Sequence, residues 1–197
     1  GGVLIWKVTD LQLLQGNILA ARSEANSLRT IPYLAERGVI YDINGLELAS
    51  NNPDRIYHGG PGLGHLVGYL ATLTPTDLAG RAGAENYFVN NLRGINGLKL
   101  SETDVRGNII SESLYRKPES GKNLWLTLDS QLTSTFYENI KTVVNQQKFQ
   151  GGAGVMMDIW DGTIVALTSY PEYDSQVITD GTDAAMIKSY IEDKRKP

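Results

Sequence analysis

The chain has no cysteine, only two histidines and no long apolar run, and each of these absences excludes a class of function. Without cysteine there are no disulfides, zinc–thiolate sites or thiol nucleophiles. His58 and His65 have no further ligands at helical spacing, so neither a metal site nor a cofactor is predicted. No apolar run approaches the roughly 20 residues of a membrane span. Cysteine-free chains occur in reducing compartments and among exported proteins, so location stays open.

Basic charge is also scarce. The 197 residues carry 18 basic and 22 acidic side chains, a net charge of −4, which argues against a nucleic-acid partner. The hydrophobic content of 41% and charged content of 20% are typical of a globular protein with one large domain or two small ones. The turn-rich segment 51–64 is predicted to be an irregular connection. It contains neither of the two glycine-rich phosphate-binding motifs, so nucleotide binding is not expected.

The usual serine-nucleophile motifs are missing as well. The sequence contains no Ser-x-x-Lys, no Lys-Ser/Thr-Gly and no Gly-x-Ser-x-Gly. Residues 50–52 match Ser-x-Asn, a pattern short enough to arise by chance. Neighbouring carboxylates such as Asp158 and Asp161 are typical of turns rather than of an acid–base pair. No catalytic residue is therefore predicted in this chain.

Two Gly-containing dipeptides predict β-hairpins. Asn44-Gly45 separates apolar segments 39–43 and 46–50, and Asp161-Gly162 separates segments 154–159 and 163–169. Such dipeptides favour two-residue turns in which both residues have positive φ. The second hairpin is apolar on both faces and so needs cover on both sides. Little sequence follows it, which predicts that a larger domain begins here.

The remaining segments predict a mixture of helices and short strands. Residues 9–28 have helical periodicity, as either a core helix or a juxtamembrane helix. Residues 65–73 read as a strand, 76–79 as a helical turn and 85–92 as a small helix. A strand at 124–128, a helix from Asp129 or Ser130 to about Phe149 and the second hairpin form a β-α-β-β unit. A last helix is expected at 182–193.

Several short motifs follow one another along the chain. They are Arg37-Gly38-x-Ile40-Tyr41-Asp42-x-Asn44-Gly45, His65-x-x-Gly68-Tyr69, Gly83-x-Glu85-x-Tyr87 with Gly94 and Gly97, Leu126-Thr127-Leu128-Asp129, and the segment from Gly162 to Asp174. In this order they resemble the N-terminal part of class B penicillin-binding proteins, which are membrane-anchored peptidoglycan D,D-transpeptidases. The resemblance marks these residues as structural: Arg37, Gly38, Asp42, Asn44, Gly45, His65, Gly68, Tyr69, Glu85, Tyr87, Gly94, Gly97 and Asp129.

The resemblance implies an α+β fold in three parts. Residues 1–30 would be a juxtamembrane helix, residues 31–120 an elongated pedestal of the penicillin-binding-protein dimerisation type with a shortened head segment, and residues 121–197 the truncated β-α-β-β start of a transpeptidase domain. The family's acylated serine would lie beyond Pro197. The whole protein is thus expected to be a serine-type transpeptidase, and this chain its non-catalytic part.

The resemblance also implies a role and a location. The pedestal would position its own transpeptidase domain and dock a membrane glycosyltransferase of the shape, elongation, division and sporulation family and a cell-shape scaffold protein, with a homodimer left open. It would act on the extracytoplasmic face of the plasma membrane, with a single N-terminal anchor missing from this chain. Arg37 is expected to pair with Asp42 or Glu85, unless these charges are simply solvated.

Three alternatives stay open. The protein could be of the division type rather than the elongation type. It could be a stand-alone scaffold that kept the module and lost the enzyme, which a Ser-x-x-Lys motif soon after Pro197 in the reading frame would exclude. It could also be a soluble enzyme of another class, which would need a pocket with perturbed titratable groups.

Overall fold

A computed structural model describes residues 28–58, 60–74, 77–103 and 108–195. The chain divides into two compact units, one formed by residues 1–34 with 96–118 and the other by residues 35–95 with 119–197. The described residues of the first unit form one small sheet, and the second unit mixes small sheets with helices, which confirms the predicted α+β class. In the described part of the chain, no helix is both long and apolar enough to cross a membrane.

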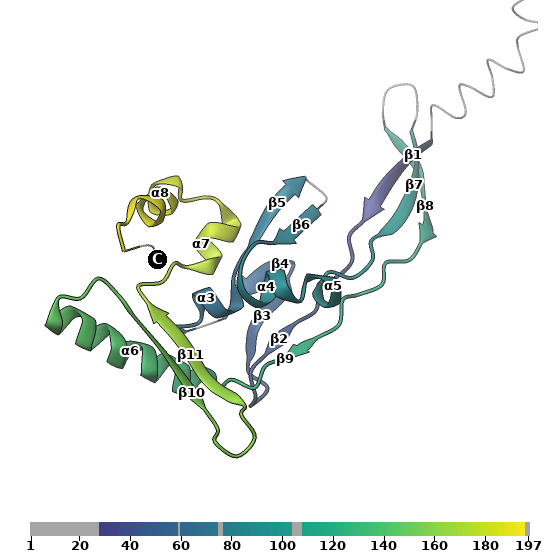
Figure 1. Ribbon diagram of the computed structural model, residues 1–197. Helices are drawn as coiled ribbons and strands as arrows, with labels where there is room; N and C mark the ends of the chain where they lie inside the picture. The colour runs from purple at the N-terminus through teal and green to yellow at the C-terminus, as the bar shows by residue number, and fades with distance from the viewer. Residues whose placement is uncertain (1–27, 59, 75–76, 104–107, 196–197) are drawn as a thin grey trace, which may run out of the picture. The chain divides into compact units, whose positions relative to one another are not determined.

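The first unit contains a three-stranded antiparallel sheet (Figure 1). Its strands are β1 (Leu28–Tyr33), β7 (Gly97–Thr103) and β8 (Ile109–Arg116), in the order β1-β7-β8. Buried positions occur only on the central β7, at Gly97 and Ser101, while every residue of β1 and β8 is exposed. The predicted helix at 9–28 lies outside the described residues apart from Leu28, which begins β1.

The second unit begins with the predicted hairpin of β2 (Ile40–Tyr41) and β3 (Glu47–Asn52). The turn differs from the prediction, because Gly45 has a φ of +81° and Asn44 does not have a positive φ. The Gly45 amide donates to the Asp42 carbonyl, and the Asp42 amide donates to the Leu46 carbonyl. This is a three-residue loop with a left-handed glycine rather than a two-residue turn.

Segment 51–64 is more regular than expected. β3 runs to Asn52, and β4 (Asp54–Tyr57) pairs with it antiparallel. The prediction of a wholly irregular connection was wrong, because tertiary pairing supplied strand partners that the turn-rich composition does not reveal. The four-stranded sheet has the order β4-β3-β2-β9, where β9 is Leu124–Trp125.

Residues 64–92 also correct the sequence-based assignment. They form α3 (Gly64–Val67), β5 (Leu70–Thr74), β6 (Asp77–Gly80), α4 (Gly83–Tyr87) and α5 (Val89–Leu92). The predicted strand at 65–73 therefore begins only at Leu70. Gly68 separates it from α3 with a φ of +79°, a conformation that glycine adopts readily. Residues 77–79 of the predicted helical turn are instead part of β6, and Thr76 lies outside the described residues.

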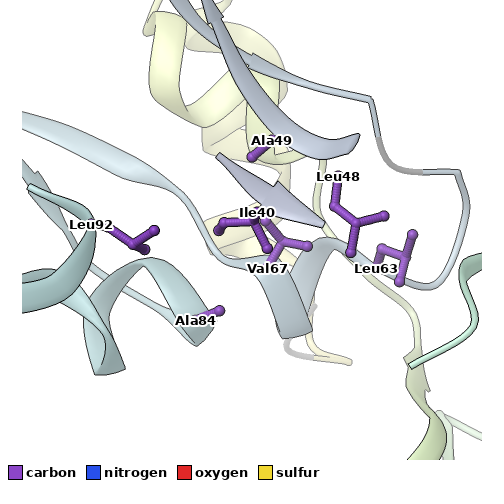
Figure 2. Packing of buried hydrophobic residues seen from close by; sticks show 7 residues of the cluster. All are labelled: Ile40, Leu48, Ala49, Leu63, Val67, Ala84 and Leu92. Atoms are coloured by element: carbon purple, nitrogen blue, oxygen red, sulfur yellow. The ribbon is translucent and has the colours of Figure 1, made fainter. Parts of the chain in front are cut away.

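The hydrophobic core of this unit lies between the four-stranded sheet and the short helices. Figure 2 shows its seven buried side chains, which come from β2, β3, the 60–64 loop, α3, α4 and α5. They are Ile40, Leu48, Ala49, Leu63, Val67, Ala84 and Leu92. Leu124 and Leu126, around β9, pack against the same cluster. The core thus joins residues on both sides of the expected boundary at 120.

The last third of the chain contains α6 (Ser130–Gln147), β10 (Gly152–Met157), β11 (Ile164–Tyr170), α7 (Ser175–Asp180) and α8 (Ala184–Glu192). The α6 helix and the β10–β11 hairpin are as predicted. Helix α6 ends at Gln147, close to the predicted Phe149, and its C-cap is Lys148, whose φ is 57°. The hairpin turn is longer than the predicted two residues, because the Asp158 amide donates to the Thr163 carbonyl across residues 159–162. Only Gly162, and not Asp161, has a positive φ.

The strand–helix–hairpin order is confirmed, but its first strand belongs to a different sheet. β9 pairs in parallel with β2, with Leu124 opposite Ile40, whereas β10 and β11 form a two-stranded sheet of their own. The expectation that one sheet begins at Leu124 and continues into the hairpin was therefore wrong. Helix α6 covers one face of the hairpin (Figure 1), while Val155 and Met157 on β10 stay more than half exposed.

Candidate functional site

Polar side chains meet at three places in the second unit, and the predicted motif residues supply many of them. We call these places the charge cluster (Arg37, Arg55 and Glu85), the turn–helix junction (Asp42, Asn44, Asp129 and Ser130) and the loop–hairpin junction (Gly62, Gly64, His65, Ser169, Glu172 and Tyr173). The charge cluster connects elements within residues 35–95. The other two join that part of the chain to residues 128–176.

The charge cluster is built around Glu85, whose side chain is fully buried at the start of α4. Its Oε2 lies 2.7 Å from Arg37 Nε, and its Oε1 lies 2.8 Å from Arg55 Nε. Arg55 Nη1 also donates to the Gly38 carbonyl at 2.8 Å. Of the two predicted partners, Arg37 thus pairs with Glu85 and not with Asp42. Burial excludes the alternative of solvated charges and makes each member costly to remove.

The turn–helix junction starts at Asp42, which is 1% exposed. Its Oδ1 accepts the amides of Asn44 at 2.9 Å and Leu46 at 2.8 Å, and its Oδ2 accepts the Ser130 hydroxyl at 2.7 Å. Burial acts to raise the pKa of Asp42. The hydrogen bonds from the Ser130 hydroxyl and from backbone amides outweigh it and hold that pKa below its usual value.

Asp129 completes this junction from the helix side. Its Oδ1 accepts the Leu132 amide at 2.9 Å and so caps α6, while its Oδ2 accepts Asn44 Nδ2 at 3.0 Å. The Ile43 amide donates to the Leu128 carbonyl at 3.0 Å. The hydrogen bonds from Leu132 and Asn44 lower the pKa of Asp129. The turn between β2 and β3 is therefore bonded directly to the first turn of α6.

The loop–hairpin junction is anchored by Glu172, which follows β11. Its two oxygens accept the amides of Gly62 at 2.6 Å and Gly64 at 3.1 Å. Burial raises the pKa of Glu172 in spite of these hydrogen bonds. The Tyr137 side chain on α6 is hydrogen-bonded to the same carboxylate, and burial raises the pKa of Tyr137. Helix α6, the 60–64 loop and the end of the hairpin thus converge on one carboxylate.

His65 on α3 also belongs to the loop–hairpin junction. Its Nδ1 is 2.7 Å from Ser169 Oγ, and its ring meets Tyr173 edge-on at 4.7 Å between centroids. Tyr69 meets the same Tyr173 ring at 5.4 Å. Burial lowers the pKa of His65, and burial likewise raises the pKa of Tyr173 to about 12. The His65–Tyr69 motif and the motif at the end of the hairpin therefore contact each other.

Helix α7 contacts strand β4 through one side chain, Gln176. The Gln176 amide oxygen accepts the Tyr57 backbone amide at 2.9 Å, and its Nε2 donates to the Arg55 carbonyl at 3.2 Å. This side chain therefore bonds the edge of β4 as a neighbouring strand would. A cavity of about 430 Å³ opens beside it, between the 60–64 loop, α6 and the start of α7. Its walls carry Tyr137, Glu172, Tyr173 and Tyr190 among others.

The other predicted residues have local roles. The Gly38 amide donates to the Leu92 carbonyl at 2.8 Å. Gly94 has a φ of +66°, and Gly97 lies in β7 of the first unit. Tyr87 is 83% exposed and stacks edge-on against Phe88. Sequence reasoning missed Arg55, Ser130, Glu172 and Gln176. Only Ser130 carried a signal, as a polar residue at a predicted helix start.

These arrangements bind parts of the chain together and offer no complete catalytic group. His65 and Ser169 resemble a base and a nucleophile, but within the described ranges no carboxylate is hydrogen-bonded or paired to His65, as a nucleophile–base–orienter arrangement requires. Nor do the residues that the structure describes include a group of three or more His, Cys, Asp or Glu side chains that could hold a metal ion.

Comparison with known proteins finds similarity to penicillin-binding proteins. Residues 52–126 match the family model for the penicillin-binding protein dimerisation domain. The chain is 23% identical over 291 residues to the peptidoglycan D,D-transpeptidase MrdA of Salmonella typhimurium strain SL1344, covering 100% of this chain and 46% of the relative. It is 27% identical over 188 residues to the peptidoglycan D,D-transpeptidase FtsI of Escherichia coli K12, covering 91% of this chain and 31% of the relative.

A solved structure described as "Structural coordination of polymerization and crosslinking by a peptidoglycan synthase complex" has the same fold. Its TM-score is 0.69 at 22% identity, and the match covers 98% of this chain and 48% of that chain. The chain therefore spans about half the length of the proteins it matches, or less. Residues 52–126 thus match a penicillin-binding protein dimerisation domain, and the chain is homologous to MrdA and FtsI, which supports the resemblance to the N-terminal module of class B penicillin-binding proteins.

Proposed function

We propose that this chain is the non-catalytic pedestal of a peptidoglycan D,D-transpeptidase that cross-links the cell wall during elongation. The observation that carries the proposal is the pair of polar junctions between residues 42–69 and residues 128–176. Through them the dimerisation-type module is bonded to the helix and hairpin with which the transpeptidase domain would begin. Such bonding suits a part that holds an enzyme domain in a fixed position.

The hairpin supports the view that further chain completes this domain. One face of β10 is open at Val155 and Met157, and its outer edge pairs with no strand in the described part of the chain. An uncharged open edge next to exposed apolar side chains is unfavourable unless something covers it. The acylated serine of the family would lie in that completing segment, since no Ser-x-x-Lys occurs within these 197 residues.

The family supports further parts of the proposal. The protein would act on the extracytoplasmic face of the plasma membrane, held by an N-terminal anchor. Its pedestal would dock a membrane glycosyltransferase of the shape, elongation, division and sporulation family and a cell-shape scaffold protein. The similarity to a protein from a peptidoglycan synthase complex is in keeping with a glycosyltransferase partner. The motif residues named from the sequence would serve as structural positions of this pedestal.

Two alternatives differ in testable ways. A division-type (septal) protein is favoured by the similarity to FtsI, and depletion would then block division rather than elongation. A stand-alone scaffold derived from the same module would lack the enzyme domain altogether. Reading the gene downstream of Pro197 separates the scaffold from the enzyme, because only the enzyme encodes Ser-x-x-Lys there.

Labelling with a fluorescent β-lactam tests whether the acylated serine lies outside these 197 residues. The 197-residue chain should remain unlabelled, whereas the longer protein should be labelled at one serine outside it. Covalent labelling of the short chain would refute its non-catalytic assignment.

A junction variant tests the positioning role in the longer protein. Glu172→Ala removes the carboxylate that accepts the amides of Gly62 and Gly64. We expect β-lactam acylation to persist while cross-linking of newly polymerised glycan falls several-fold. Glu138→Gln, on the exposed side of α6, is the matched control and should change neither activity. Equal cross-linking by both variants would contradict the positioning role.

A further inference from the structure

The loop that joins β10 to β11 exposes two large apolar side chains at its tip. Ile159 is 88% exposed and Trp160 is 90% exposed, and they are adjacent in sequence. We call residues 158–163 the hairpin tip; it projects from the end of the hairpin in Figure 1. Ile164, the first residue of β11, is exposed as well. Single exposed apolar residues are ordinary, but a contiguous group containing tryptophan marks an interaction site.

The backbone of the hairpin tip is held in one shape. The Asp158 amide donates to the Thr163 carbonyl at 2.8 Å, and the Gly162 amide donates to the Asp158 carbonyl at 3.0 Å. The Asp158 carboxylate accepts the Trp160 amide at 2.7 Å, and the Asp161 carboxylate accepts the Thr163 amide at 2.8 Å. A loop held by four hydrogen bonds presents Trp160 with little ordering entropy left to lose on binding.

The charge around the hairpin tip has one sign. Residues 149–187 contain six carboxylates and no lysine, arginine or histidine. Two of the six, Asp158 and Asp161, lie on either side of Ile159 and Trp160. Hydrogen bonding to Thr163 lowers the pKa of Asp161, so this group is ionised at neutral pH. Paired carboxylates beside an apolar anchor disfavour an anionic lipid surface and favour a cationic protein surface.

We propose that the hairpin tip is a docking site for a second protein whose surface has an apolar pocket rimmed by lysine or arginine. Trp160 and Ile159 would fill the pocket, and Asp158 and Asp161 would pair with the rim. Tryptophan is among the residues that contribute most to protein interfaces, and charged rims chiefly set association rate and salt dependence. This inference does not depend on the proposed function, because the hairpin tip lies outside both polar junctions.

Photo-crosslinking in the full-length protein tests the inference. The probe is p-benzoylphenylalanine at position 160, irradiated in cells of the source organism, with adducts mapped by mass spectrometry. We expect one dominant adduct with a different protein, joined at an apolar residue that has lysine or arginine neighbours. The same probe at position 191, on α8 and also exposed, should not give this adduct.

A charge-neutral variant makes the test specific. Asp158→Asn with Asp161→Asn keeps an oxygen to accept each amide and removes both charges, so the hairpin tip should keep its shape. We expect the adduct yield to fall at least tenfold. In lysates the unsubstituted adduct should weaken as salt rises from about 0.05 to 0.5 M, because screening shortens the range of charge attraction.

Five outcomes would overturn the inference. An adduct within the same polypeptide would mean that another part of the protein covers the hairpin tip. An adduct with a second copy would indicate self-association, and an adduct with lipid alone would indicate a membrane contact. The inference also fails if no adduct forms, or if the adduct yield does not change when both aspartates are replaced by asparagine.

Discussion

His65 Nδ1 lies 2.7 Å from Ser169 Oγ, although 104 residues separate them in the sequence. His65 belongs to a short helix in the first half of the second unit, and Ser169 lies near the end of β11. The pair joins two of the motifs by which the family was recognised. The two motifs therefore contact each other in the folded chain.

The charge cluster predicts a large loss of stability for Glu85→Gln. The variant leaves two buried guanidinium groups without a counter-charge, and breaking a buried pair costs about 3–5 kcal/mol. Urea denaturation of the 197-residue chain measures the change. Glu138→Gln is the control, because Glu138 forms an exposed pair with Lys141 and should change stability by under about 1 kcal/mol. Similar losses in both variants would contradict this account.

Substituting Gly68 by alanine should destabilise the fold by a steric clash as well as by its backbone conformation, and the two effects can be measured separately. It has a φ of +79°, and an added Cβ would collide with the Ala82 carbonyl. Gly181 has a φ of +64° but has no atom within 4 Å of its added Cβ. Gly181→Ala should therefore cost only about 1 kcal/mol for the left-handed backbone. Gly68→Ala should cost clearly more, as measured by thermal melting, and equal costs would remove the steric explanation.

The turn–helix junction predicts that Asn44 and Asp129 are energetically coupled. Asp129→Ala removes both the cap of α6 and the bond from Asn44, and loss of a cap costs about 1 kcal/mol. In a double-mutant cycle with Asn44→Ala, we expect a coupling energy of about 0.5–1 kcal/mol in urea denaturation. Additive single effects would show that the 3.0 Å contact between the two side chains contributes nothing to stability.

His65 predicts a pH dependence with a definite sign. Burial lowers the folded-state pKa of His65 below its ordinary value of 6.5, so the unfolded chain binds the proton more readily. The contribution of His65 to stability is complete above pH 6.5 and declines as the pH falls toward the lower folded-state pKa. His65→Gln should flatten the stability profile in that window. An unchanged profile for His65→Gln in urea denaturation across this window would contradict the account.

Sequence patterns located many elements but not their partners. The helical stripe and cap placed α6, and the Asn-Gly and Asp-Gly dipeptides placed both hairpins. The same patterns could not show that β9 pairs with β2, since a two-residue strand carries no signal for its neighbour. The assignment of 65–73 as one strand failed because a left-handed glycine interrupts an apolar run without changing its hydrophobicity.

The amino-acid sequence by itself determined the absence of thiol chemistry and of serine-nucleophile motifs, the positions of α6 and the hairpins, and the family resemblance. These features are local, since they depend on composition, periodicity and short motifs. Only the tertiary structure decided that Arg37 pairs with Glu85, that Asp42 accepts from Ser130, and that Glu172 accepts the amides of the 60–64 loop. Those choices depend on which segments pack together, because a charged or polar group can be buried only where the fold brings a partner to it.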